Sequence, residues 1–408
     1  MFPCPSSART LFSTARSLYT APKSLPLDVL IEEELIPGYD PKRFYHPNPG
    51  EILDGDLSRK QRLDGGTTST VSHDGATARH ELDISDHVDR AKSDESRYRY
   101  VRTVEDSCEI SGPNRSHLCL VLEPMREPIW LLRRRLGSDK VTRDFLPFFK
   151  LYIIVLLDGL DYLYTKCSII HTDLKLDNIL VTFGDKSVID EFVQGQTQEP
   201  MPRKVLDDWT VYLSYNDFGH LRLVRDTPAL MKICPKIIDF DLAQRGDGQG
   251  LLIHPIQVDH CRAPEVWDLL AGEELFQKFN SKDGTYSARH HLAEIIALLG
   301  PVPPGLMKRE RNMRHWQWAL DAVNAKGKLC NNGADFYGGP FFDDNGHFVG
   351  NDFVPSDRHL KDIVPEYIID EEAEIFLSFM RRMLYWLPEE RATAEELQNH
   401  PWLDLARD

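Results

Sequence analysis

One polar stretch, HTDLKLDN at residues 171–178, limits what this chain can be more than any other feature. An apolar run with helical spacing precedes it at residues 151–163, and a short β-rich apolar run follows it at residues 179–181. These patterns predict a helix, a loop and a strand. The loop carries an acid, a base and an amide at Asp173, Lys175 and Asn178. An ordinary polar turn would have the same pattern, so the choice between a turn and a reactive loop depends on the rest of the chain.

Length and charge set the first limits. The chain has 408 residues, 41% of them hydrophobic, which suffices for one large two-lobed domain or two ordinary ones. Its formal net charge is −16. An acidic surface disfavours binding to nucleic acid or to an anionic membrane, and it suits a basic peptide partner. Acidity also serves solubility alone, so both interpretations of the charge stay open.

The cysteines and the N-terminal segment bear on location. The seven cysteines are scattered, form no CxxC pair and are odd in number, which argues against a disulfide framework or a zinc site. A reducing compartment, cytoplasmic or nuclear, is therefore expected. No apolar run reaches membrane-spanning length. Residues 1–27 are compatible with a mitochondrial transit peptide because Arg9, Arg16 and Lys23 occur without an acid, although an unstructured tail over residues 1–30 is favoured.

The chain divides by pattern into a smaller and a larger part. Residues 31–124 contain short β-rich runs and one helical segment, and they predict a small sheet-rich domain. Residues 125–404 are mostly helical, with a turn-rich insertion at about 182–235. We therefore expect an α+β fold with a small N-terminal lobe and a large helical C-terminal lobe.

Two motifs follow the polar loop. Asp239 ends the apolar run KIID and is followed by Phe240 and a second carboxylate, Asp241. The stretch Arg-Ala-Pro-Glu ends at Glu265, and a later Arg391 is a candidate partner for that carboxylate. No Ser, Thr or Tyr lies between Asp239 and Glu265, so phosphorylation within this segment is chemically impossible.

Two weaker signals lie earlier in the chain. The stretch RLDGGTTSTV places Gly65 and Gly66 before small polar residues and Val71, a pattern in which glycines let backbone amides approach phosphate oxygens. Without context, a plain turn explains it better. Glu81 lies in ARHELDISDHV, an expected helix, where a solvated carboxylate is the simpler interpretation.

Together these residues resemble the protein kinase superfamily. The stretch HTDLKLDNIL corresponds to its catalytic loop, and Asp239 and Glu265 correspond to its metal-binding Asp and the end of its activation segment. More narrowly, the chain looks like the serine/arginine-rich-protein kinases and their fungal relatives. Thr172 in place of the usual Arg, the long spacer between Asn178 and Asp239, and the stretches at 31–55 and 118–132 point there.

The resemblance implies a serine/threonine kinase that transfers the ATP γ-phosphate to Ser in basic Arg/Ser-rich proteins. It covers residues 31 to 403 and implies a monomer that binds neither nucleic acid nor membrane. The residue roles that it implies are as follows: Asp173 as base and Lys175 as charge neutraliser; Asn178 and Asp239 as Mg²⁺ ligands; Gly65, Gly66, Val71, Glu81, Glu123 and Met125 as ATP-site residues; Glu265 and Arg391 as a structural ion pair.

Two departures leave an alternative open. No Lys lies between Lys60 and Lys92, where the ATP-anchoring Lys is expected, and Arg79 does not replace it conservatively. The helix after Glu265 is shorter than the family pattern, so that Asp268 would support the catalytic loop only through a rearranged backbone. The small lobe is thus expected to be incomplete, and the alternative is a weak or inactive pseudokinase that acts as a binding scaffold. A small-molecule kinase of the aminoglycoside phosphotransferase type is disfavoured by the Arg-Ala-Pro-Glu stretch and Arg391.

Overall fold

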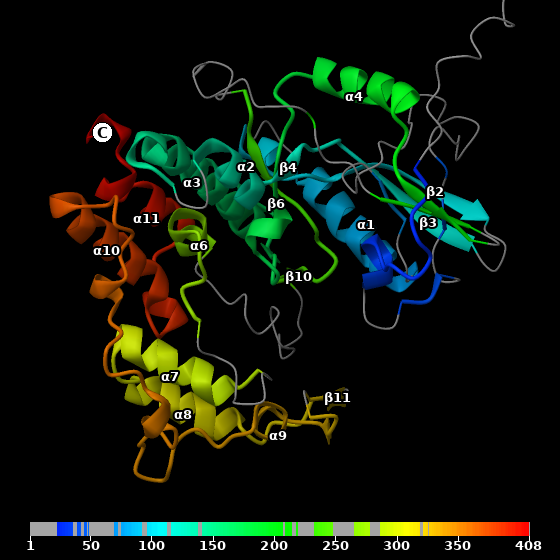
Figure 1. The fold of residues 1–408 in the computed structure, drawn as a ribbon. Helices are drawn as coiled ribbons and strands as arrows, with labels where there is room; N and C mark the ends of the chain where they lie inside the picture. The colour runs from blue at the N-terminus through cyan, green and yellow to red at the C-terminus, as the bar shows by residue number, and fades with distance from the viewer. Residues whose placement is uncertain are drawn as a thin grey trace, which may run out of the picture. The chain divides into compact units, whose positions relative to one another are not determined.

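A computed structural model gives the fold as a mixture of helices and strands (Figure 1). It describes residues 23–35, 39–41, 45–46, 48, 69–71, 75–91, 96–111, 116–137, 141–206, 209–213, 218, 232–247, 265–277, 286–318, 321–324 and 326–407. The chain divides into two compact units. The first unit contains residues 1–82, 104–127 and 182–233, and the second contains the rest.

An antiparallel sheet forms the centre of the first unit. Its strands have the order β1-β3-β2, with bounds β1 Ser69–Val71, β2 Val104–Ser111 and β3 Ser116–Leu122. Alternate residues of β3 face one side, because successive side chains of a strand point to opposite faces. Leu118, Leu120 and Leu122 use that side to pack against Ala78 of helix α1 (Gly75–Arg90). The expected short β-rich runs and the helix that carries Glu81 are therefore present.

The insertion after the polar loop folds within the same unit. It contains α4 (Ser187–Gln198), β7 (Arg203–Val205) and β8 (Thr210–Tyr212), and Phe183, Phe192 and Phe218 form a small aromatic cluster. Lys204 of β7 is fully buried, and it pairs with the carboxylate of Glu34 from the N-terminal segment and donates to the carbonyl of Val29. Glu34 thus compensates the charge of a buried ammonium.

Helix α3 (Leu146–Asp161) is central to the second unit. Its residues Phe149, Ile153, Leu156 and Leu157 are buried, at a spacing that gives a helix one apolar face. α11 (Ala394–Gln398) begins with a complete capping box, because Thr393 and Glu396 exchange side-chain to backbone hydrogen bonds. The remaining bounds in this part are β4 Glu127–Pro128, α2 Ile129–Gly137, β5 Ile169–Ile170, β6 Ile179–Val181, β9 Pro235–Ile237, β10 Gln244–Arg245, α6 Glu265–Ala271 and α10 Asp370–Leu384.

Large aromatic side chains fill the core behind α10. Phe376 is fully buried, with its ring centroid 5.9 Å from that of Trp267 on α6 and 5.0 Å from that of Trp402 near the C-terminus. Burial of such rings is among the largest single contributions to folding. Segments that are far apart in the sequence are therefore held together around α10.

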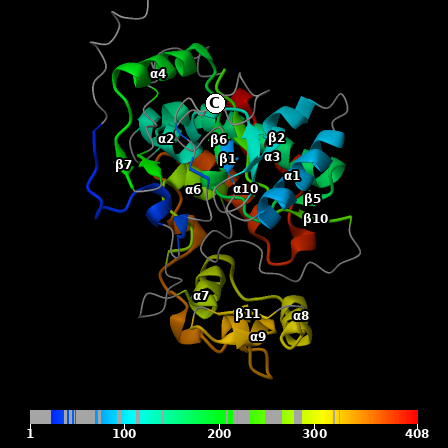
Figure 2. The same ribbon diagram turned by 90° about the vertical axis from the view of Figure 1, so that its right-hand side faces the viewer.

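A satellite cluster completes the second unit. Figures 1 and 2 both show α7 (Ala288–Leu299) and α8 (Pro304–Met313) in the same part of the second unit. Ala293 of α7 packs with Val302, Phe342 and Phe348 in one apolar cluster. The nearby short elements are β11 Ala322–Val323, β12 Leu329–Cys330 and α9 Gly333–Tyr337.

The described residues contain no helix with the length and apolar character needed to cross a membrane. The insertion groups with the first unit, whereas the sequence suggested that it belongs to the larger part of the chain. The domain boundaries at 31–124 and 125–404 and the incompleteness of the small lobe stay predictions.

Candidate catalytic site

The polar loop lies between β5 and β6; the strand after it was predicted, whereas the short strand before it was not. Two of its functional side chains, Lys175 and Asn178, contact the third, Asp173. The Oδ2 atom of Asp173 accepts a hydrogen bond from the Nζ of Lys175 at 2.7 Å and from the Nδ2 of Asn178 at 3.0 Å. Asn178 also donates to the main-chain carbonyl of Asp173 at 2.9 Å. Asp173 is only 3% exposed. Charge-assisted bonds of this kind are roughly twice as strong as neutral ones, so one oxygen of the carboxylate is firmly held.

The other oxygen of Asp173 is different. Its Oδ1 atom is buried, and within the described part of the chain it accepts no hydrogen bond. A buried acceptor without a donor costs about 1–3 kcal/mol. The site therefore presents one oriented carboxylate oxygen that a hydroxyl group from outside would satisfy.

His171 connects this loop to the strand end that carries Asp239. Its Nδ1 accepts from the backbone N–H of Asp173 at 3.4 Å, so the proton of the neutral ring lies on Nε2, which donates to the carbonyl of Ile238 at 2.8 Å. The ring lies 5.2 Å from that of Phe240, centroid to centroid. Burial lowers the pKa of His171, so the neutral form is the one that fits this position.

Two backbone positions near the loop are strained. Thr172 and Asp239 both have positive φ angles, of 66° and 68°. For residues other than glycine, such a conformation costs roughly 1–3 kcal/mol and is often found at functional sites. The hydroxyl of Thr172 donates to the carbonyl of Leu242 at 2.7 Å, which ties the loop to the residues after Asp239.

Asp239 has a second carboxylate beside it. The pKa of Asp241 is raised to about 6, first by burial and then by the neighbouring charge of Asp239. Carboxylate and amide oxygens suit Mg²⁺, and the Nδ2 of Asn178 already binds Asp173, which leaves the amide oxygen of Asn178 as its ligand atom. The donors at Asn178 and Asp239 therefore fit the expected metal. No cluster of three or more His, Cys, Asp or Glu groups able to hold a metal occurs among the described residues.

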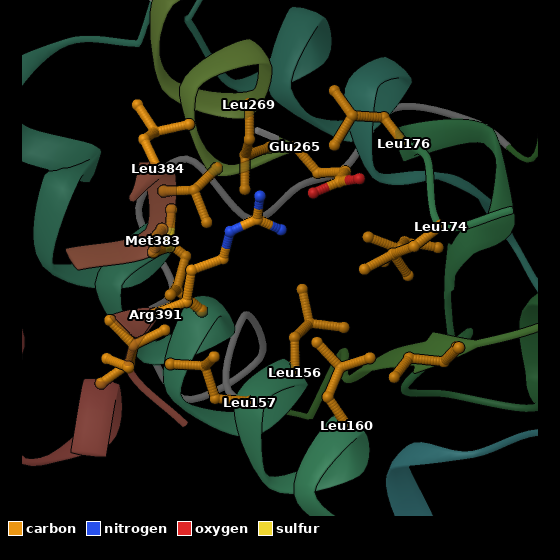
Figure 3. Close-up of a pocket in the computed structure, with 16 residues that line it drawn as sticks. Leu156, Leu157, Leu160, Leu174, Leu176, Glu265, Leu269, Met383, Leu384 and Arg391 are labelled. Atoms are coloured by element: carbon orange, nitrogen blue, oxygen red, sulfur yellow. The ribbon is translucent and has the colours of Figure 1, made fainter. Parts of the chain in front are cut away.

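Glu265 and Arg391 line one apolar cavity of about 250 Å³ in the second unit. Figure 3 shows the guanidinium of Arg391 and the carboxylate of Glu265 pointing into the same side of it. The Nε of Arg391 donates to the carbonyl of Tyr385 at 2.7 Å, and burial lowers the pKa of Arg391. The two residues are thus brought together, and their ion pairing stays a prediction.

A second cavity of about 250 Å³ is lined by more acids than bases, with Arg133 and Lys175 as its two cations. Burial, and then the charges of Glu265 and Glu274, raise the pKa of Asp268 to about 7. Arg133 donates to the backbone carbonyl of Asp268 at 3.1 Å. The lining carboxylates are Asp177, Glu265, Asp268, Glu273 and Glu274. No docking residues were expected from the sequence, in which the adjacent pair Glu273-Glu274 after the short helix was the available signal.

Only some of the residues expected at the ATP site lie within the described part of the chain. Gly65 and Gly66 lie outside the described residues. Val71 ends β1, opposite Cys119 of β3, and Glu81 lies on α1. Met125 is completely buried and Glu123 is half-buried at the end of β3. All the described members of this group belong to the first unit, and their roles stay predictions.

Besides His73 and His80, Arg79 was the only basic candidate near the position in the sequence expected for the ATP-anchoring Lys. It lies on the exposed side of α1 and pairs with Glu109 across 3.4 Å. Nothing in this contact connects Arg79 to phosphate binding.

Comparison with known proteins finds serine/threonine protein kinases. A serine/threonine protein kinase of Aspergillus fumigatus is 28% identical over 418 aligned positions, which cover 92% of this chain and 91% of that protein. The serine/threonine-protein kinase SRPK of Physarum polycephalum is 26% identical and covers 76% of this chain and 72% of its own length. Human SRSF protein kinase 3 is 35% identical over 133 residues, which are 32% of this chain and 22% of that protein.

No family model matches the chain. The long alignments to kinases nevertheless extend over both units, and kinase homology implies a two-lobed fold of the mixed α and β kind described above. With Lys175 and Asn178 both bonded to Asp173 on the loop, these alignments support an SRPK-like member of the protein kinases.

Proposed function

We propose that this chain is an active kinase that uses ATP and Mg²⁺ to phosphorylate serine in basic, Arg/Ser-rich proteins. The observation that carries the proposal is the buried Oδ1 of Asp173, which has no hydrogen-bond donor among the described residues while Oδ2 is held by Lys175 and Asn178. A serine hydroxyl would supply that donor. General bases act from within hydrogen-bond reach of the proton that they take.

The reaction follows from this arrangement. The substrate Oγ forms a bond to the γ-phosphorus while the bond from that phosphorus to the bridging oxygen of ADP breaks. The hydroxyl proton passes to Oδ1 of Asp173, and the ammonium of Lys175 neutralises negative charge next to the reacting groups. Mg²⁺ held by Asn178 and Asp239 would neutralise the phosphate oxygens.

The acidic cavity supports a basic substrate. It adjoins Lys175, and the mutual repulsion of its carboxylates is relieved when a guanidinium or ammonium group enters. Glu273 and Glu274 are exposed, so a peptide can reach them. An arginine near the phosphorylated serine would place its charge there. This assignment of the substrate also agrees with the net charge of −16.

The test is phosphate transfer to a peptide of alternating arginine and serine, measured as ADP release in Mg²⁺. Asp173→Asn keeps the shape and removes the proton acceptor, and we expect a loss of about 10²–10⁴-fold in kcat. Asp352→Asn is the matched control at an exposed position. Equal activity in wild type and Asp173→Asn would overturn the proposal.

The substrate class has its own test. The double variant Glu273→Gln and Glu274→Gln is expected to raise KM for the arginine-containing peptide several-fold, with a smaller effect at high salt. Glu374→Gln, an exposed carboxylate on α10, is the control. An unchanged KM would leave the kinase activity standing and reject the basic-substrate assignment.

A pseudokinase scaffold is the second candidate. Two observations favour it. No Lys occurs between Lys60 and Lys92. Asp241 carries a raised pKa of about 6 beside Asp239, where a second carboxyl group would compete with Mg²⁺ for the carboxylate of Asp239. A thermal melt with and without Mg²⁺-ATP distinguishes the two. At a hundredfold excess over Kd, a ligand stabilises by about 2.7 kcal/mol, and Asp239→Ala should abolish that shift. A cooperative melt that ATP leaves unchanged would favour the scaffold.

A further inference from the structure

Two cysteines lie directly opposite each other on neighbouring strands of the sheet of the first unit. The register of the antiparallel pair β2 and β3 places Cys108 directly opposite Cys119. The alternation along β3 puts Leu118 and Leu120 on the face that packs against α1, so Cys119 and its partner lie on the opposite face. The pairing joins residues that appear scattered in the sequence.

This position satisfies the distance requirement of a disulfide. Directly opposed residues of an antiparallel pair have Cα atoms about 4.5–5.5 Å apart. Disulfides form when the Cα atoms are about 4.4–6.8 Å apart. Both residues are reduced cysteines in the structure. The register therefore brings the two Cα atoms within the range that a disulfide spans.

The two thiols differ in access and acidity. Cys108 is half-buried, whereas Cys119 is 1% exposed. Burial, and next the proximity of Cys108, raises the pKa of Cys119 to about 12. Cys119 therefore keeps its proton, and a reagent from solution meets Cys108 first.

We propose that Cys108 and Cys119 form a reversible oxidation site for a hydroperoxide, which converts the two thiols into a disulfide within one chain. In the first step the sulfur of Cys108 attacks one peroxide oxygen, the O–O bond breaks, and a sulfenic acid forms together with one water from hydrogen peroxide, or one alcohol from an organic hydroperoxide. In the second step the sulfur of Cys119 attacks the sulfenic sulfur, the S–O bond breaks, and the thiol proton leaves with the hydroxyl group as water. The two sulfurs together supply the two electrons that reduce the peroxide.

The disulfide would join neighbouring strands and leave the α1-facing core in place. A dithiol reductant reverses it by exchange, which regenerates both thiols and oxidises the dithiol. A reversible bond of this kind is compatible with the reducing compartment that the cysteine content suggests.

The experiment uses the full reduced chain treated with hydrogen peroxide, quenched, denatured and alkylated with N-ethylmaleimide. Trypsin cleaves after Arg115 and so separates the two cysteines. Mass spectrometry should find the peptides 103–115 and 116–126 joined, with two hydrogens fewer than the sum of their reduced masses. Dithiothreitol before alkylation should remove this product.

Three variants make the test specific. Cys108→Ser should abolish the product and leave Cys119 open to alkylation after denaturation. Cys119→Ala should stop the reaction at a sulfenic acid on Cys108, which dimedone traps. Cys330→Ser, at another buried cysteine, should leave the product unchanged. Each variant is checked for a cooperative melt. If Cys119→Ala does not fold, Cys108→Ser provides the test, because Cys108 is only half-buried.

Three results would overturn the proposal. One is full alkylation of both cysteines at a peroxide dose that consumes a free model thiol. Another is oxidation of Cys108 to sulfinic acid while Cys119 remains a thiol. The third is a Cys108–Cys119 link that forms only between chains, seen as a dimer on a non-reducing gel.

Discussion

The side-chain amide of Asn178 donates to the Oδ2 atom of Asp173 at 3.0 Å and to the backbone carbonyl of the same residue at 2.9 Å. Both residues are buried. One amide group therefore fixes the orientation of the candidate catalytic carboxylate and the shape of the loop that carries it.

Asn178→Ala removes both bonds at once. Because a charged acceptor would lose a donor in a buried position, we expect the free energy of unfolding to fall by about 1–3 kcal/mol. Urea denaturation measures this loss. The matched control is Asn399→Ala, where the amide bonds one backbone carbonyl at an exposed position. Equal losses in the two variants would mean that Asn178 contributes no more than a surface asparagine.

Lys150 gives a second test of a buried charge. Its ammonium is 2.9 Å from Glu372 and 5.3 Å from the ring centroid of Trp402, and its side chain is 3% exposed. Glu372→Gln removes one charged partner of this buried ammonium and should destabilise by about 2–4 kcal/mol in urea denaturation, since the loss of one partner of a buried pair costs up to 3–5 kcal/mol. Glu371→Gln is the control, because Glu371 is an exposed acid in the same first turn of α10. Similar losses in both variants would assign the effect to the helix terminus.

The part of the site that the sequence predicted is local. The helix α3, the polar loop and β6 follow one another, and periodicity together with three polar residues suffices to place Asp173, Lys175 and Asn178 near each other. His171 was not singled out, although its ring joins the loop to Ile238, because one histidine at the start of a loop carries no distinctive pattern.

The part that the sequence did not predict depends on tertiary contacts. Lys150 meets Glu372 across a separation of 222 residues. Cys108 meets Cys119 because of the strand register, and a shift by one residue would point one of the two away. The acidic cavity likewise joins Asp177 to Glu273 and Glu274. Neither the composition of the chain nor the spacing of its residues predicts such tertiary contacts.

The apolar cavity that contains Glu265 and Arg391 should accept more side-chain volume (Figure 3). Val266→Leu on α6 adds a methylene toward this space and also replaces a β-branched residue in a helix. We expect a gain of about 1 kcal/mol from burial, seen as a higher melting temperature. Val323→Leu, at a side chain that is 61% exposed, is the control. A lower melting temperature for Val266→Leu alone would mean that the cavity has no room near this residue.

The raised pKa of Asp268, about 7, predicts a pH effect on stability. A folded-state pKa above the unfolded value of about 3.9 means that the folded state binds the extra proton, so this group opposes folding increasingly from about pH 4 to pH 7, by at most about 4 kcal/mol. Asp268→Asn removes this term, and its amide oxygen can still accept from the N–H of Leu275, as the carboxylate does at 3.1 Å. Urea denaturation at several pH values should show the variant gaining on wild type as pH rises and levelling off above pH 7. Asp357→Asn, at an exposed carboxylate, should show no such trend, and a pH-independent difference for Asp268→Asn would contradict the prediction.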